Sequence, residues 1–239
     1  MKFEYSEKII ALCKHAEEVN REKVIYLSEK IAENIENDKI IYVFGTGHSY
    51  MAGLEMFFRA GGLGNVCAML DPDVLVTFGA RRSGPMEKTP GVADVIYDTY
   101  GIEAGDMMII NTNSGRNAMP IEMAARAQKE GVFTVVITNL NQSKSSTSRH
   151  PSGKKAYEFA DLIIDNCCPI GDGMMDIDGI KTGPASTIVV MFLLNIAITE
   201  AMKLVVSRGK RPYVFQSQNV DGYDNEAIYK KFGNRIKHL

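Results

Sequence analysis

The sequence predicts a doubly wound α/β fold, in which helices cover both faces of a parallel sheet. Short apolar runs alternate along the chain with longer segments of helical periodicity, and turn residues separate the two kinds of segment. The short runs are apolar at both parities, as in strands that are buried on both faces of a parallel sheet. The chain has 239 residues, enough for one large domain or two small ones.

The first element is a long amphipathic segment. From Tyr5 to Asn37 apolar residues recur every three or four positions, which predicts one long helix or two helices joined near Asn20. Ile40–Phe44 is the first predicted strand. The remaining elements are expected, in chain order, as a helix at Tyr50–Ala60, strands at Val66–Leu70 and Met107–Ile110, a helix at Asn117–Glu130 that Gly131 ends, strands at Val132–Ile137 and Leu162–Ile164, and a helix from about Pro184 to Val206.

Three segments do not fit the alternation, namely 71–92, 139–155 and 167–183. Each follows a predicted strand, so each should overhang the carboxyl edge of the sheet, where doubly wound folds bind their ligands. We expect a single domain over residues 1–239, with a leading helical segment at 1–38. The C-terminal tail, 209–239, is too short to be a second domain, and it either closes over the site or only packs.

The composition argues against several classes of protein. Hydrophobic residues make up 45% and charged residues 23%, which is typical of a folded chain. The formal charge of −2 favours neither nucleic acid nor an anionic membrane as a partner. The longest apolar run, Ile188–Ile198, is interrupted by Asn195 and is shorter than the roughly 20 residues of a membrane span. A charged first segment and four cysteines without a CxxC pair predict a cytoplasmic protein.

Two predicted strand-to-helix loops carry donors for an anion. They are residues 45–49 (Gly-Thr-Gly-His-Ser) and residues 111–117 (Asn-Thr-Asn-Ser-Gly-Arg-Asn). Glycines let a ligand approach the backbone, and a helix start supplies unpaired N–H groups with a partial positive charge. Either loop alone could be only a turn with a helix cap at Ser114 or Asn117. Two such loops on one sheet favour a phosphate-type site.

The first loop does not match a nucleotide-binding motif. The third glycine of G-x-G-x-x-G would fall at Tyr50, and the lysine of a P-loop is missing. Asp71 is the only near candidate for an acidic ribose contact. A nucleotide-binding Rossmann protein is therefore the least favoured hypothesis, and no cofactor is expected.

The two loops together resemble the sugar isomerase (SIS) domain family. Ala124, Ala125, Gly131 and the run Val-Val-Ile-Thr at 135–138 extend the resemblance, which covers almost the whole chain. His150–Lys155 is similar to a less characterised bacterial subgroup of phosphosugar isomerases, as is Asn219-Val220. The resemblance implies a flavodoxin-like, three-layer α/β/α sandwich with a five-stranded parallel sheet and the long leading helix. It also implies a sugar phosphate as ligand and assembly into homodimers or tetramers, and the apolar face of 5–37 is expected to pack against a second copy.

The resemblance also implies which residues bind the phosphate. Transferred to this sequence, the positions are Ser49, Thr112, Ser114 and Asn117, the last of which is commonly Ser or Thr in the family. An amide is also a hydrogen-bond donor, so this departure leaves binding possible. The neighbouring residues of the same loops are included in the predicted binding site: Gly47, Asn113, Gly115 and Arg116.

Catalytic residues are less clearly indicated. Aldose–ketose isomerisation needs a base that moves a proton between C1 and C2. The catalytic Glu of phosphoheptose isomerase would fall at Arg59, so that mechanism does not transfer. The candidates are Glu87 in 71–92, His48 in the first loop and Asp172 in 167–183, where glucosamine-6-phosphate synthase has a catalytic Glu. His150 and Glu55 are better explained as surface or structural residues.

The acidic segment around Asp172 superficially resembles a calcium loop, but its register is wrong and the expected Glu is missing. Without paired His or clustered Cys, zinc is disfavoured as well, so no metal is predicted. The favoured function is a sugar-phosphate isomerase. The alternatives are a non-catalytic sugar-phosphate sensor and a deglycase or etherase on the same scaffold. The predicted partners are a sugar phosphate and further copies of this chain.

Overall fold

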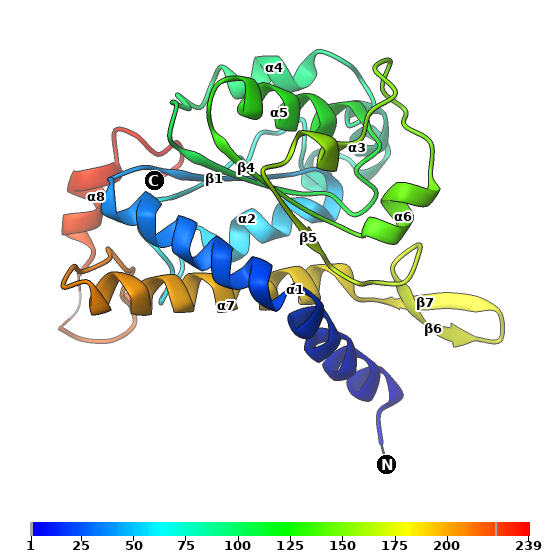
Figure 1. Ribbon diagram of the computed structural model, residues 1–239, viewed down its shortest axis with the longest axis horizontal. Coiled ribbons are helices and arrows are strands. Elements are labelled where there is room, and N and C mark those ends of the chain that lie inside the picture. The colour runs from blue at the N-terminus through cyan, green and yellow to red at the C-terminus, as the bar shows by residue number, and fades with distance from the viewer. Residues whose placement is uncertain (1, 223) are drawn as a thin grey trace.

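The computed structural model describes residues 2–222 and 224–239, and it confirms the predicted α/β class. The strands of the main sheet are β1 (Ile41–Gly45), β2 (Val66–Ala68), β3 (Met107–Asn111), β4 (Phe133–Thr138) and β5 (Leu162–Asp165). They are all parallel and lie in the order β2-β1-β3-β4-β5 (Figure 1). Because the strand order reverses beside β1, the carboxyl ends of β1 and β3 form the switch point of the sheet.

Helices cover both faces of this sheet, which makes the predicted three layers (Figure 1). One face carries α1 (Glu4–Glu36), α2 (Met51–Met56) and α7 (Ser186–Ser207), and the other carries α4 (Val92–Tyr97), α5 (Ala118–Lys129) and α8 (Glu226–Phe232). The strand β1 explains the division, since its side chains alternate. Ile41 and Val43 belong to the core under α1 and α7, whereas Tyr42 and Phe44 belong to the core under α5.

The helix α1 is continuous, so the alternative of two helices joined near Asn20 is wrong. Asn20 is fully buried, yet its amide is satisfied by the preceding turn of α1 and by β5. Its Nδ2 donates to the carbonyls of Ala16 and Asp165, each at 2.7 Å, and its Oδ1 accepts from the Asp165 N–H at 3.0 Å. A polar residue on the buried face therefore joins α1 to β5 instead of interrupting the helix.

The helix α7 agrees with the predicted helix from about Pro184 to Val206. It has 22 residues with a mean hydropathy of 2.0 over its most apolar window, and 44% of that window is buried. The helix continues through Asn195, whose Nδ2 donates to the Met191 carbonyl and to Glu55 Oε1. By length and composition α7 is the one helix among the described residues that could cross a membrane. The core helix of a water-soluble protein passes the same test, and α7 packs along α1.

The three overhanging segments contain short elements of their own. Residues 71–92 include η2 (Val76–Phe78) and α3 (Ala80–Met86), and residues 139–155 begin with α6 (Leu140–Ser145), which η3 (Ala156–Phe159) follows. The third segment is an antiparallel hairpin of β6 (Gly173–Ile177) and β7 (Ile180–Pro184), which the sequence analysis did not predict. This hairpin extends past the body together with the N-terminal turns of α1 (Figure 1), and Tyr5 Oη donates to the Pro184 carbonyl.

The C-terminal tail packs against the chain before β2. Phe215 donates its N–H to the Gly62 carbonyl at 2.9 Å and accepts from the Gly61 N–H at 2.8 Å, and Val214 forms a bridge with Leu63. The side chain of Phe215 lies in the core that α8 completes. Of the two alternatives for the tail, the structure favours packing.

Candidate functional site

The two predicted donor loops meet at the switch point. The first follows β1 and forms a short 3₁₀ helix, η1 (Gly47–Tyr50), before α2 begins; the second follows β3 and ends at α5. Asn111 Nδ2 donates to the Ser49 carbonyl at 3.0 Å, which joins the loops directly. The backbone also approaches closely, since a Cβ on Gly45 would lie 2.4 Å from the Ser49 carbonyl oxygen. The loops are therefore one unit.

The second loop closes on itself around Thr112. Gly115 takes a positive φ of 60° and donates its N–H to Thr112 Oγ1 at 3.2 Å. Its carbonyl accepts from the Ala156 N–H at 2.9 Å. Ser114 is half-buried at the tip of this loop, just before the N-terminus of α5. This arrangement gives an anion a hydroxyl beside the positive end of a 12-residue helix.

Glu87 spans the two loops, although it comes from neither. Thr46 Oγ1 donates to its Oε2 at 2.8 Å, and Asn117 Nδ2 donates to its Oε1 at 2.5 Å. Its backbone carbonyl also accepts from the Met119 N–H. The prediction that 71–92 overhangs the loops and brings Glu87 to them therefore agrees with the geometry. A carboxylate oriented by two side-chain donors is a suitable general base.

Asn117 links Glu87 to a cation that the sequence analysis missed. The Asn117 Oδ1 atom accepts from Arg149 Nη1 at 3.1 Å, so both polar atoms of this amide are engaged. Arg149 also donates its N–H to the Arg116 carbonyl at 2.8 Å. Arg149 could have been found, because it lies in a Ser/Thr-rich segment that follows a strand of the same sheet.

The structure places the other predicted site residues in different surroundings. The side chain of Asn113 donates to Gln142 Oε1 and accepts from Asn166 Nδ2. His48 is exposed on η1 within the first loop. Asp172 caps α7, because its carboxylate accepts from the N–H groups of Ala185 and Ser186 and from the Ser186 hydroxyl. Of the three catalytic candidates, Glu87 has the contacts that place it between the loops.

Residue His150 connects two overhanging segments beside α5. Its Nε2 donates to Glu122 Oε1 at 3.2 Å, and its Nδ1 lies 2.8 Å from Ser152 Oγ. Both Glu122 oxygens also accept from the Gly91 N–H, at 3.1 and 2.9 Å. Glu122 and His150 therefore hold 139–155 against the end of 71–92, which supports the structural interpretation of His150.

Lys155 is buried under the second loop. Its Nζ donates to the carbonyls of Ser143 and Ser146 and to Ser146 Oγ. Burial, and then the nearby charge of Arg116, lower the pKa of Lys155 from its ordinary value.

Replacing Lys155 by Met should lower the free energy of unfolding by about 1–3 kcal/mol, because two carbonyls lose their donor in a buried place. Urea unfolding would measure the loss. The exposed neighbour provides a matched control, since Lys154 places its Nζ over the Phe159 ring and Lys154→Met leaves those carbonyls paired. Equal stabilities of the two variants would contradict this role of Lys155.

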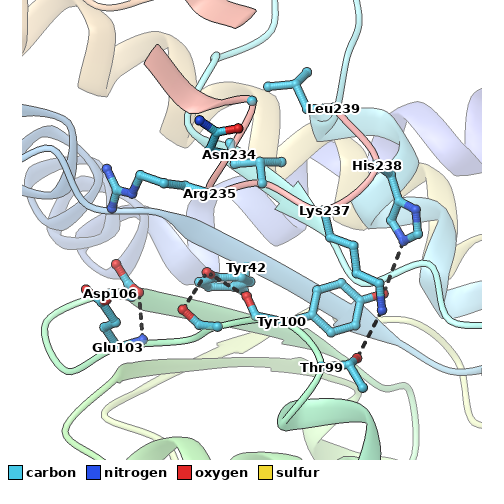
Figure 2. A pocket seen from close by; sticks show the side chains of 13 residues that line it. Tyr42, Thr99, Tyr100, Glu103, Asp106, Asn234, Arg235, Lys237, His238 and Leu239 are labelled. Carbon is cyan, nitrogen blue, oxygen red and sulfur yellow. Dashed lines mark hydrogen bonds between the residues drawn. The ribbon is translucent and has the colours of Figure 1, made fainter. Parts of the chain in front are cut away.

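A cavity of about 530 Å³ lies elsewhere, between the amino ends of β1 and β3 and the C-terminal residues (Figure 2). Figure 2 shows hydrogen bonds from several of its polar side chains to one another and to the backbone. Tyr42 Oη donates to the Tyr100 carbonyl, Lys237 donates to Thr99, and Asp106 accepts from backbone N–H groups. Because ligands of doubly wound folds bind at the opposite edge, this cavity is not the candidate site.

The residues that the structure describes contain no group of three or more His, Cys, Asp or Glu side chains that could hold a metal ion. Asp176, from the segment with a superficial calcium-loop pattern, instead pairs with Lys181 across the hairpin at 2.8 Å. This ion pair and the Gly179 N–H lower the pKa of Asp176.

Comparisons with known proteins show the family of this chain. A family model described as the SIS domain matches residues 4–139. A UPF0309 protein of Halalkalibacterium halodurans is 37% identical over 216 residues, which cover 89% of this chain and 86% of that protein. Another, from Caldanaerobacter subterraneus, is 34% identical and is matched over 98% of both chains.

Two solved structures share the fold. A phosphoheptose isomerase from Neisseria gonorrhoeae superposes with a TM-score of 0.53 at 15% identity, over 81% of this chain and 93% of its own. The NanR protein of Vibrio vulnificus, solved in complex with ManNAc-6P, also gives 0.53, at 12% identity over 86% of this chain and 63% of its own. At such identities the likeness concerns the fold.

Proposed function

The chain belongs to the SIS-domain family, and from this premise we propose that it is a sugar-phosphate isomerase that works at the two loops. SIS domains bind sugar phosphates, and the geometry of the site supports a particular reaction. The observation that carries the proposal is the position of Glu87, whose carboxylate bridges Thr46 in the first loop and Asn117 in the second.

The chemistry follows from this position. The hydroxyl of Ser114 and the N-terminus of α5 hold the phosphate, so that the sugar extends toward Glu87. The carboxylate of Glu87 takes the proton from C2 of the open aldose while the C1 carbonyl oxygen gains a proton, which gives an enediol. Return of the proton to C1, with loss of the proton on the C2 oxygen, gives the ketose. Exposed His48 in the first loop is the candidate for assisting ring opening.

Replacing Ser114 by Ala should weaken sugar-phosphate binding roughly tenfold to a hundredfold, which corresponds to about 1–3 kcal/mol for a hydrogen bond to a charged group. Isothermal titration calorimetry with fructose 6-phosphate, glucose 6-phosphate and sedoheptulose 7-phosphate would measure this. Ser145→Ala is the control, because Ser145 is exposed on α6 and donates to the Gln142 carbonyl. An unchanged affinity in Ser114→Ala would reduce the second loop to a capped turn.

The isomerase step has its own test. Proton transfer through a protein base exchanges the transferred hydrogen with solvent, so a turned-over sugar phosphate should gain deuterium at C1 or C2 in D₂O. Proton NMR of a panel of pentose, hexose, heptose and N-acetylhexosamine phosphates would detect it. A sugar phosphate that binds tightly but gains no deuterium and gives no product would contradict the isomerase. That result would favour the second candidate, a non-catalytic sugar-phosphate sensor; NanR, which shares the fold, was solved in complex with the sugar phosphate ManNAc-6P.

We also propose that the chain assembles with further copies of itself through the α1 and α7 layer. More than half of the most apolar window of α7 is not buried within one chain, and a helix that is apolar all round is normally covered. Exposed apolar side chains continue over this layer at Ile10, Val19, Ile25 and Ile188. We expect multi-angle light scattering at micromolar concentration to give at least twice the chain mass of 26.4 kDa. A monomer, or a protein that requires detergent, would contradict this assembly.

A further inference from the structure

The segment that joins β4 to η3 is strongly basic. Residues 143–155 contain no Asp or Glu. They contain six hydroxyl side chains and four cationic residues, Lys144, Arg149, Lys154 and Lys155. The segment follows a strand of the parallel sheet, so it lies at the edge that carries the two donor loops. It is bonded to the second loop through the Arg149 N–H, which donates to the Arg116 carbonyl at 2.8 Å.

The cations around this junction have no carboxylate partner among the described residues. Arg116 donates to Thr147 Oγ1 and Arg149 donates to Asn117 Oδ1, and neither forms a salt bridge there. Arg126, further along α5, contacts three carboxylates instead: Asp94, Asp98 and Glu130. Arginines that are left unneutralised beside a helix N-terminus favour an anion from outside the chain.

Unsatisfied polar atoms mark the same place. Arg116 Nε and Ser143 Oγ are both inaccessible to solvent, and neither has a hydrogen-bond partner among the residues described. The Ser143 side chain is fully buried and points at the second loop, where its Oγ would lie 3.0 Å from a Cβ on Gly115. Native proteins rarely leave such atoms unpaired, so Arg116 and Ser143 keep unused hydrogen-bonding capacity beside the second loop.

Arg149 lies at the start of α5, and its contact there also brings it close to the base. The phosphate site is built from Ser114 and the start of α5, whose neutral donors and dipole suffice for one phosphate group. Arg149 Nη1 is 3.1 Å from the Oδ1 atom of Asn117, the N-cap of α5, and the Nδ2 atom of the same amide is 2.5 Å from Glu87. The guanidinium therefore flanks the base, beside which the sugar carbons would lie, and not only the phosphate.

We propose that Arg149 and Arg116 form a second anion subsite, so that the preferred ligand is a sugar phosphate with a second acidic group. This group is a carboxylate or a second phosphate, both of which match the planar, bidentate donors of arginine. The inference rests on the proposed function, because it assigns the substrate class of the same site.

The test compares ligands that differ by one acidic group. Sorbitol 6-phosphate and 6-phosphogluconate are both open chains and differ by a carboxylate, and fructose 6-phosphate and fructose 1,6-bisphosphate differ by a phosphate. Calorimetry at fixed ionic strength should show the diacidic member of at least one pair binding tenfold or more tightly. The pair that shows the gain identifies the second group.

Arg149→Gln should remove this gain and leave the affinity for the monoacidic member within about threefold. Arg149→Lys keeps the charge but not the bidentate geometry, so this variant should keep part of the gain in affinity for the diacidic ligand. Lys129→Gln is the matched control, since it removes one exposed positive charge at the opposite end of α5. Thermal unfolding of each variant would confirm that it is folded.

Equal affinities within both pairs would overturn the second subsite and leave the sugar-phosphate site standing. Equal losses in Arg149→Gln and Lys129→Gln would also overturn it, because they would reflect net charge alone. If Arg149→Gln weakened both members of a pair equally, Arg149 would be a phosphate contact. Binding of none of the four compounds would reject the subsite and the proposed function together.

Discussion

Glu87→Gln should lower kcat by a factor of roughly 10²–10⁴ while sugar phosphates still bind, because general-base catalysis typically contributes that much. The amide has the shape of the carboxylate but cannot take a proton. Its oxygen can accept from Asn117 while its NH₂ group faces the Thr46 hydroxyl, which is also able to accept, so the bridge between the loops is kept. The measurement is the rate of product formation together with calorimetric affinity for the same sugar phosphate.

Glu122→Gln is the matched control for this experiment. Glu122 is also a carboxylate that joins two segments, but it accepts from the Gly91 N–H and from His150 outside the loops. We expect its variant to retain most of the activity. An active Glu87→Gln enzyme would remove Glu87 from the mechanism, and comparable losses in both variants would indicate that the carboxylates only hold the overhanging segments.

Gly45→Ala should disrupt the site by displacing the backbone of the first loop, without removing any candidate ligand side chain. The new Cβ would lie 2.4 Å from the Ser49 carbonyl oxygen and 2.5 Å from its carbon. Both are backbone atoms, so the first loop itself must move, and overpacking of this kind costs about 1–3 kcal/mol. The bond from Asn111 to the Ser49 carbonyl would be strained with it. We expect a lower unfolding free energy and at least a tenfold loss of sugar-phosphate affinity.

Gly84→Ala provides the comparison, because nothing lies within 4 Å of its ideal Cβ. This variant should bind and unfold like the parent protein. Urea unfolding and calorimetry on both variants would separate a steric effect from a general effect of adding a methyl group. A Gly45→Ala protein with the parent's affinity would show that the first loop is not part of the site.

Local patterns predicted most of the fold. The alternation of apolar runs with helical periodicity located the five parallel strands, because strands buried on both faces need apolar residues at both parities. The hairpin of β6 and β7 was missed, since Gly173–Ile177 is neither a buried run nor a regular alternation. The hydrogen bonds of Asn20 to β5 could not be predicted either, because its partner there, Asp165, is distant in the sequence.

The two loops of the candidate site could be predicted from the sequence, whereas the hydrogen bonds that connect its segments were less predictable. Glycines and hydroxyl residues after a strand indicate an anion site through local geometry alone. The side chains that an amide such as Asn117 contacts depend on how segments that are distant in the sequence come together. Its bonds to Glu87 and Arg149 therefore became visible only in the folded chain. For the same reason Asp172, attractive as an acid in a loop, could not be recognised as the cap of α7.

The buried amide of Asn20 also bears on the uniqueness of the native state. A 33-residue helix lying on a sheet through aliphatic side chains could slip by one turn at little cost in hydrophobic contact. The Asn20 amide meets both the N–H and the carbonyl of Asp165 in one axial setting, and a slip of one turn would break both bonds and leave only the bond to Ala16 within the same helix. Asn20 therefore fixes the axial position of α1 on the sheet, because it selects one alignment among several that are nearly equal in packing.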